Sequence, residues 1–204
     1  MASNGAPPVA PHAVRRLEGP ASAALADLVE TFEELQTSLR CCERLVAELA
    51  ADEPDAVLVE AVWTMALLSY GRCFSAGAGG TPLTEVDLTT AQPAGEVVEW
   101  HRMLLLLRDH QTDPATNPRE RFSIGVTQDA DGTASGVAIT SVRQPLVDDL
   151  TVRQTGAIAY ALSSLVNGRI ESEQEQVFAQ LKSTTKEELD KLEPLEVTPP
   201  PGTP

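Results

Sequence analysis

Apolar residues recur at alternating steps of three and four between residues 25 and 49, which is the spacing of one face of an α-helix. Val29 and Leu45 widen the stripe, and regular opposite charges do not flank it. We therefore expect a long helix inside a bundle, while leaving dimerisation through this seam open. The seam consists of Leu25, Leu28, Phe32, Leu35, Leu39, Cys42, Val46 and Leu49.

Two further helices are predicted in the first half of the chain. Residues 57–70 are apolar on nearly every side, with Glu60 the only charge, which is typical of a central helix. Asp52-Glu53-Pro54 predicts its start, because proline favours a first helical turn. Residues 81–93 are interpreted as a loop, and a third helix is expected from about 95 to 111.

A β-hairpin should follow, because Phe122, Ile124 and Val126 alternate with polar or small residues. Asp131-Gly132 favours the positive φ of a tight turn, and residues 137–142 supply the return strand. Since an isolated two-stranded hairpin is marginally stable, we expect this one to pack on the helices.

Helical periodicity returns after Pro145 and continues to Leu165; the helix then either ends at Asn167-Gly168 or extends to Leu192. The fold class is therefore mainly α, a helical bundle with one inserted β-hairpin at about 121–142. The expected organisation is a flexible N-terminal segment (1–20), a helical domain (21–192) and a Pro-rich disordered tail (193–204).

The charge balance excludes several classes of partner. Asp and Glu outnumber Lys and Arg by 30 to 15, and the formal net charge is −15. DNA and anionic membranes attract the opposite charge, so we expect neither as a partner, and RNA only through a local pocket. A protein partner or a homo-oligomer fits better. The preference for Arg over Lys is typical of a GC-rich bacterial genome or its phage.

The spacing of the cysteines and histidines does not indicate a metal or cofactor site. The cysteines, Cys41, Cys42 and Cys73, form no C-x-x-C pair, and no apolar leader is present, so we expect a cytoplasmic protein with reduced thiols. His101 and His110 would lie about 13 Å apart along one helix, too far apart to chelate one ion. We expect no metal and no cofactor.

A group of polar residues in helical, largely apolar surroundings is the most informative feature. Tyr70 and Arg72 end the second predicted helix, and His101 shares a face of the third with Arg108. The first interpretation is a structural network in which Glu60 or Asp109 neutralises an arginine and His101 donates to a backbone carbonyl. The second is a catalytic site.

A resemblance rests on three stretches of sequence: Ser69–Gly77, then Leu104-x-x-Leu107-Arg108-Asp109-His110 after His101, then Asn117–Glu120 with Gly125-Val126. Together, over residues 57–127, they resemble small bacterial HEPN-like and abortive-infection-type helical proteins. The resemblance implies a helical bundle, often dimeric. It also implies a metal-independent ribonuclease in which an arginine stabilises the phosphate and a histidine transfers the proton, here Arg108 with His101 or His110.

The chain departs from the family pattern at its most important point. The lysine and the second histidine are missing after Arg108-Asp109-His110, where Asp113-Pro114 follows instead. On a helix, Arg108 and His110 point in nearly opposite directions.

The sequence therefore favours a degenerate, non-catalytic HEPN-like protein that acts by protein–protein association in a bacterial or phage stress setting. An active ribonuclease of a toxin–antitoxin system remains the second hypothesis. A structural or assembly protein that uses the seam at 25–49 and the Pro-rich tail remains the third.

Overall fold

The chain is mainly α-helical, as predicted, and carries two small antiparallel sheets of two strands each. The structure is a computed structural model, and it describes residues 13–75, 81–92 and 95–196. The helices are α1 (Pro20–Leu49), α2 (Ala56–Arg72), α3 (Glu85–Ala91), α4 (Val97–Thr112), α5 (Asp149–Leu181) and α6 (Lys186–Leu189). The strands are β1 (Val14–Arg15), β2 (Glu120–Gln128), β3 (Ala134–Arg143) and β4 (Pro194–Leu195).

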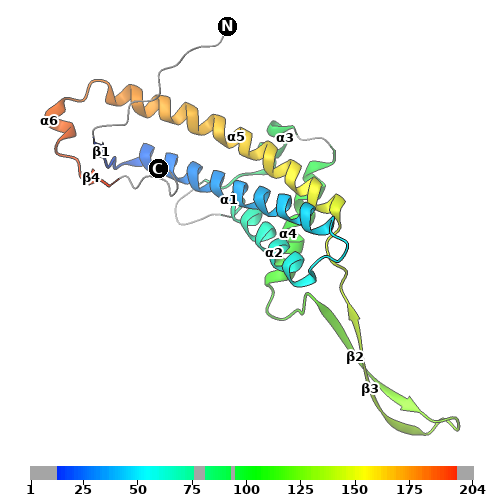
Figure 1. Cartoon of the computed structure of the whole chain (residues 1–204). Helices are drawn as coiled ribbons and strands as arrows, with labels where there is room; N and C mark the ends of the chain where they lie inside the picture. The colour runs from blue at the N-terminus through cyan, green and yellow to red at the C-terminus, as the bar shows by residue number, and fades with distance from the viewer. Residues whose placement is uncertain (1–12, 76–80, 93–94, 197–204) are drawn as a thin grey trace.

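Helix α1 is the centre of the helical body and packs against both α5 and α2 (Figure 1). Its apolar seam packs in these contacts: Leu35 and Cys42 of the seam and the neighbouring Leu45 are buried, and other seam residues pack around them. At the α1–α5 crossing a Cβ at Gly156 would lie only 3.3 Å from Cys42 Cβ, so glycine permits the close approach. The apolar seam of α1 is therefore covered by α2 and α5 of the same chain.

Helix α5 runs without a break through Asn167-Gly168, so the prediction that it ends there is wrong and the longer alternative is nearer. Val166 and Ile170 are buried on either side of this pair, and their packing holds the backbone helical. The helix ends at Leu181, and a separate short helix, α6, follows before Leu192. Tertiary burial thus outweighs the local preference of Asn-Gly for a cap.

Two predicted boundaries differ from the structure in the first half of the chain. The N-cap of α2 is Asp55, whose carboxylate accepts from the backbone N–H groups of Val57 and Leu58, and so Pro54 precedes the helix. The predicted loop at 81–93 contains α3, which begins with a capping box between Thr84 and Asp87. The glycine-rich stretch Gly77-Ala78-Gly79-Gly80, which by its sequence predicts the stop after the second helix, lies outside the described residues.

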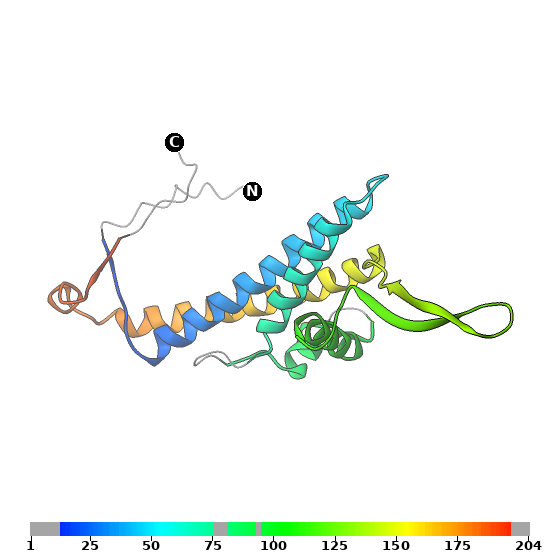
Figure 2. The same cartoon turned by 90° about the horizontal axis from the view of Figure 1, so that it is seen from below.

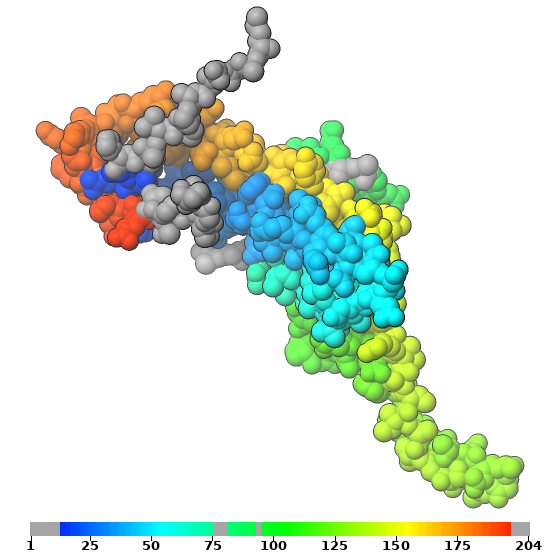
Figure 3. All heavy atoms as spheres, in the orientation of Figure 1, coloured from blue at the N-terminus to red at the C-terminus, as the bar shows by residue number. Residues whose placement is uncertain are grey.

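The β2–β3 hairpin, with its connecting turn, is called the hairpin arm here (residues 120–143). It projects away from the helical body in both ribbon views and stands clear of it in the space-filling view (Figures 1, 2 and 3). The prediction of a hairpin at 121–142 is confirmed, but the expectation that it packs on the helices is wrong. Its apolar side chains are exposed, with Ile124 68% and Ile139 72% accessible.

The two terminal segments meet, which the sequence analysis did not predict. Val14 and Arg15 of β1 pair with Leu195 and Pro194 of β4. The Arg15 guanidinium also donates to the Leu192 carbonyl over 3.1 Å. The four paired residues belonged to the predicted flexible segment and tail; residues 1–12 and 197–204 of those two segments lie outside the described residues.

Candidate functional site

The polar group predicted from the sequence lies where α2 packs on α4. The Tyr70 hydroxyl and His101 Nδ1 share a hydrogen bond of 2.9 Å, and both side chains are buried. The Phe74 ring lies 4.2 Å from the His101 ring and 5.1 Å from the Tyr70 ring, measured between centroids. The expected backbone partner of His101 is therefore replaced by a tyrosine hydroxyl.

Burial determines the protonation of this pair. Removal from water lowers the pKa of His101, and Arg102 and Arg108 lower it further, while Glu85 opposes them. Burial likewise raises the pKa of Tyr70 far above its ordinary range. Both groups are therefore neutral near pH 7, and a neutral hydrogen-bonded pair suits a helix interface better than it suits proton transfer at an exposed phosphate.

Arg108 adds a second connection between the same two helices. Its Nε and Nη2 donate to Asp109 Oδ1 over 2.9 and 2.7 Å, and Nη1 donates to the Gly71 carbonyl over 3.4 Å. A Cβ at Gly71 would lie 2.4 Å from Arg108 Cδ, so glycine leaves room for this arginine. The guanidinium is thus engaged by protein groups on α2 and α4.

His110 lies apart from this cluster. It is exposed and lines a pocket with Trp100 and Leu107, whereas Arg108 does not line that pocket. The structure therefore brings His101 and Arg108 to the α2 interface and sends His110 to another face. This placement follows the helical geometry expected for residues two positions apart.

The remaining predicted network residues form other ion pairs. Arg72 Nη1 lies 3.0 Å from Glu34 Oε1, so its partner comes from α1. Glu60 pairs with Arg119, which immediately precedes the hairpin arm. The predicted alternatives were that Glu60 or Asp109 neutralises Arg72 or Arg108, and the Asp109–Arg108 pair is the one present.

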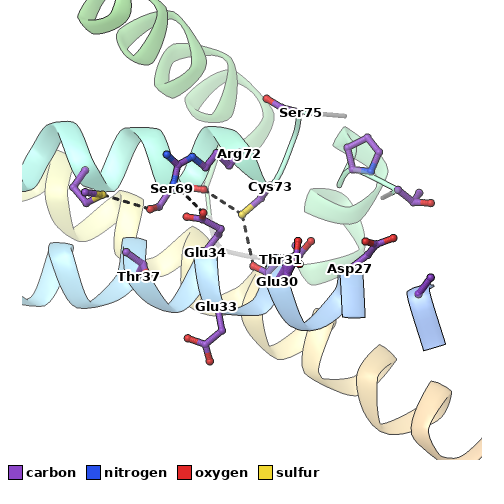
Figure 4. Close-up of a pocket in the computed structure, with 14 residues that line it drawn as sticks. Asp27, Glu30, Thr31, Glu33, Glu34, Thr37, Ser69, Arg72, Cys73 and Ser75 are labelled. Carbon is purple, nitrogen blue, oxygen red and sulfur yellow. Dashed lines mark hydrogen bonds and ion pairs between the residues drawn. The ribbon is translucent and has the colours of Figure 1, made fainter. Parts of the chain in front are cut away.

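An open groove of about 900 Å³ follows α1 and α2. Figure 4 shows Arg72 reaching from α2 toward Glu34, while Glu33 points away from α2. The other carboxylates of α1 that line the groove belong to Asp27, Glu30 and Glu33. Their charge repels a phosphate backbone, so the groove is unsuited to RNA.

The cysteine in this groove is not an activated nucleophile. The Cys73 thiol donates to the Ser69 carbonyl over 3.3 Å and lies 3.7 Å from the Thr31 carbonyl (Figure 4). Burial, followed by the charge of Glu34, raises the pKa of Cys73 to about 12. The thiol is therefore protonated and structural at neutral pH.

A second cavity, the arm-base pocket, lies where the hairpin arm leaves the body. It has a volume of about 740 Å³. Trp63 of α2, Trp100 of α4 and Val147 before α5 supply apolar walls, and Arg119 and Arg143 lie at the arm end. Aromatic walls beside cationic groups are typical of surfaces that bind other molecules.

The hairpin arm itself has two unlike faces. Directly paired residues share a face, and the register pairs Ile124 with Ile139 and Val126 with Val137. With Phe122 they make an exposed apolar surface, called the arm face here. The opposite face carries Arg121 paired with Val142 at its base and otherwise only Ser, Thr, Gly and Ala. Contiguous exposed apolar patches of this kind mark interaction sites.

The sequence alternation identified these residues but assigned them to the core. It missed the charges at the ends of the hairpin arm, which are Asp129 and Asp131 at the turn and Arg119, Glu120, Arg121 and Arg143 at or beside the base. These charged residues can be read from the sequence, but their exposure follows only from the projection of the hairpin.

Within the described ranges no group of three or more His, Cys, Asp or Glu side chains is arranged to hold a metal ion. No helix in that part of the chain is long and apolar enough to span a membrane. The chain matches no known protein-family model, and neither the comparison with curated proteins nor that with solved structures found a match.

Proposed function

We propose that this protein is a non-catalytic, HEPN-like helical protein that acts by protein–protein association through its hairpin arm. The observation that carries the proposal is the arm face, where five large apolar side chains are each more than half exposed: Phe122, Ile124, Val126, Val137 and Ile139. A free hairpin is marginally stable in water, and an apolar partner on this face would stabilise it.

The polar cluster supports a structural role for the residues that a ribonuclease would use. Arg108 is engaged by Asp109 and Gly71, and His101 is buried against Tyr70. His110 faces the arm-base pocket instead. This arrangement favours association over RNA cleavage, in a bacterial or phage stress setting and in a reducing cytoplasm that suits the three free cysteines.

Co-purification from the producing cell tests the proposal. Two differently tagged copies report self-association, and mass spectrometry identifies any other partner recovered in stoichiometric amount. The variant Ile124→Asp/Ile139→Asp should lose the partner, whereas Ser123→Asp/Thr140→Asp, which places the same charges on the opposite face, should retain it. Circular dichroism confirms that both variants keep their helices. Equal recovery with both variants would contradict the proposal.

A further inference from the structure

Both tryptophans of the chain, Trp63 of α2 and Trp100 of α4, line the arm-base pocket. Trp63 is almost fully buried, so Trp100, which is partly exposed, presents the larger aromatic surface. Val57 and Leu146 add exposed apolar side chains to the lining. The volume of about 740 Å³ is within the range of cavities that bind ligands.

One polar atom at this pocket lacks a partner. The Trp100 Nε1–H is buried and has no hydrogen-bond acceptor within the described part of the chain. An indole N–H can only donate, and a buried donor without an acceptor costs free energy. An occupant that supplies a carbonyl oxygen to Nε1 would remove this cost, once the atoms that cover the N–H move aside.

The acidic and basic side chains around the pocket are nearly balanced. Glu60 pairs with Arg119, and both line the pocket. Arg143, which also lines it, lies opposite Glu120 in the strand register. A strongly charged occupant would therefore leave part of its charge unpaired, which is costly beside apolar walls. The lining favours an uncharged segment that presents backbone carbonyls and apolar side chains.

The sequence contains an uncharged, proline-rich segment of this kind. Residues 197–204 include Pro199-Pro200-Pro201 and a fourth proline, and they carry no charged side chain. Consecutive prolines favour the polyproline II helix, which has no internal hydrogen bonds and so leaves its carbonyl groups free to accept. Proline-rich segments dock in aromatic-lined grooves. The stretch around Pro7-Pro8 has a shorter run of prolines.

This segment does not reach the arm-base pocket of its own chain. The pocket includes Thr151 in the first turn of α5, whereas β4 lies beyond the opposite end of that helix (Figures 1 and 2). From Thr151 to Leu181 the helix rises about 45 Å. Residues 197–204 extend at most about 29 Å from the end of the described chain. The occupant must therefore come from a second copy.

We propose that the arm-base pocket binds the proline-rich segment 197–204 of a second copy of this chain, with a segment carbonyl accepting from Trp100 Nε1. The prolines would pack on the Trp100 ring and the apolar lining around it. Each copy has one such pocket and one such segment, so two copies can exchange them reciprocally about a twofold axis. This contact is separate from the arm face and goes beyond the association proposed above.

Sedimentation velocity tests whether the segment mediates self-association. All chains carry Ile124→Asp/Ile139→Asp, so that any association measured does not come from the arm face. This parent chain should self-associate, whereas adding Pro199→Ala/Pro200→Ala/Pro201→Ala should leave it monomeric. Adding Pro7→Ala/Pro8→Ala instead should leave the association unchanged. The replaced prolines lie outside the helical body, and thermal unfolding confirms that the body is intact in each chain.

A labelled peptide of residues 193–204 tests the pocket directly. It should bind the triple-alanine chain, whose own segment no longer competes, and it should change the intrinsic fluorescence, which comes chiefly from the two pocket tryptophans. A peptide with alanine at 199–201 should not bind. Trp100→Phe keeps an aromatic wall without the N–H and should weaken binding about three- to tenfold. Tyr160→Phe, at an exposed tyrosine on α5, is the control and should bind normally.

Four results would overturn the proposal: a parent chain that stays monomeric, a peptide that does not bind, an alanine peptide that binds equally well, or unchanged affinity in Trp100→Phe. Stronger binding of a peptide of residues 5–12 would overturn the choice of segment. Since the arm face is disabled throughout, none of these results bears on the proposed function.

Discussion

The Tyr70 hydroxyl lies 2.9 Å from His101 Nδ1 in the buried contact between α2 and α4, and Arg108 of α4 donates to the carbonyl of Gly71, the residue after Tyr70. Through these two contacts, the polar residues that the sequence offered as a catalytic site hold α2 and α4 together. The hairpin arm, in contrast, presents exposed apolar side chains such as Ile124 and Ile139. The stability of the helical body and association through the hairpin arm can therefore be tested by separate substitutions.

Removal of the Tyr70 hydroxyl should destabilise the helical body without affecting association. Tyr70→Phe leaves His101 Nδ1 buried without its partner, which costs about 1–3 kcal/mol of unfolding free energy. Urea unfolding followed by circular dichroism measures the loss. Tyr160→Phe is the matched control, because Tyr160 is 63% exposed. Equal stability of the two variants would show that the bond contributes nothing.

Acidification should weaken the fold through His101. Its pKa in the folded chain lies below the ordinary value of about 6.5, mainly because of burial. The unfolded chain therefore binds more protons between the two pKa values, and the unfolding free energy falls as pH drops below about 6.5. This contribution is fully present above that pH.

Urea midpoints measured between about pH 7.5 and 5 test the titration. The variant His101→Gln cannot titrate at this position and should show a shallower decline than wild type. His110→Gln removes an exposed histidine and should retain the wild-type decline. A decline that is identical in His101→Gln and wild type would assign the pH dependence to other groups.

Gly71 should be required for the position of Arg108. In Gly71→Ala the new Cβ would meet Arg108 Cδ at 2.4 Å, so the arginine must move and its bond to the Gly71 carbonyl is lost. We expect a net loss of about 1 kcal/mol, with the higher helix propensity of alanine acting in the opposite direction. The loss should disappear when Arg108→Ala removes the clash, as a double-mutant cycle would show. Gly168→Ala, in open space on α5, should be neutral or stabilising.

The purified chain should not cleave RNA in EDTA. Arg108 and His101 are engaged in the α2–α4 contact, and the α1–α2 groove is acidic. A labelled RNA incubated with the protein should remain intact, and Arg108→Ala should be indistinguishable from wild type in this assay. Cleavage by wild type that Arg108→Ala abolishes would restore the ribonuclease hypothesis.

Periodicity predicted most of the helices because each has an apolar stripe that the fold buries. Helix α3 was not predicted, because it is too short to show an apolar period. Thr84 and Asp87 nevertheless have the spacing of its capping box. The continuity of α5 depends on the packing of Val166 and Ile170, which is a tertiary effect. The alternation at Phe122 to Val126 specified one apolar face of a hairpin, but a sequence pattern does not say whether the same chain covers that face.

Site-specific photo-crosslinking in the producing cell tests the central claim most directly. A benzophenone side chain at Ile139 lies on the arm face, and one at the neighbouring Thr140 lies on the opposite face at the same height along the hairpin arm. The account predicts a strong protein adduct from position 139, identified by mass spectrometry, and little from position 140. Equal adduct yields from both positions, or none from 139, would contradict association through the arm face.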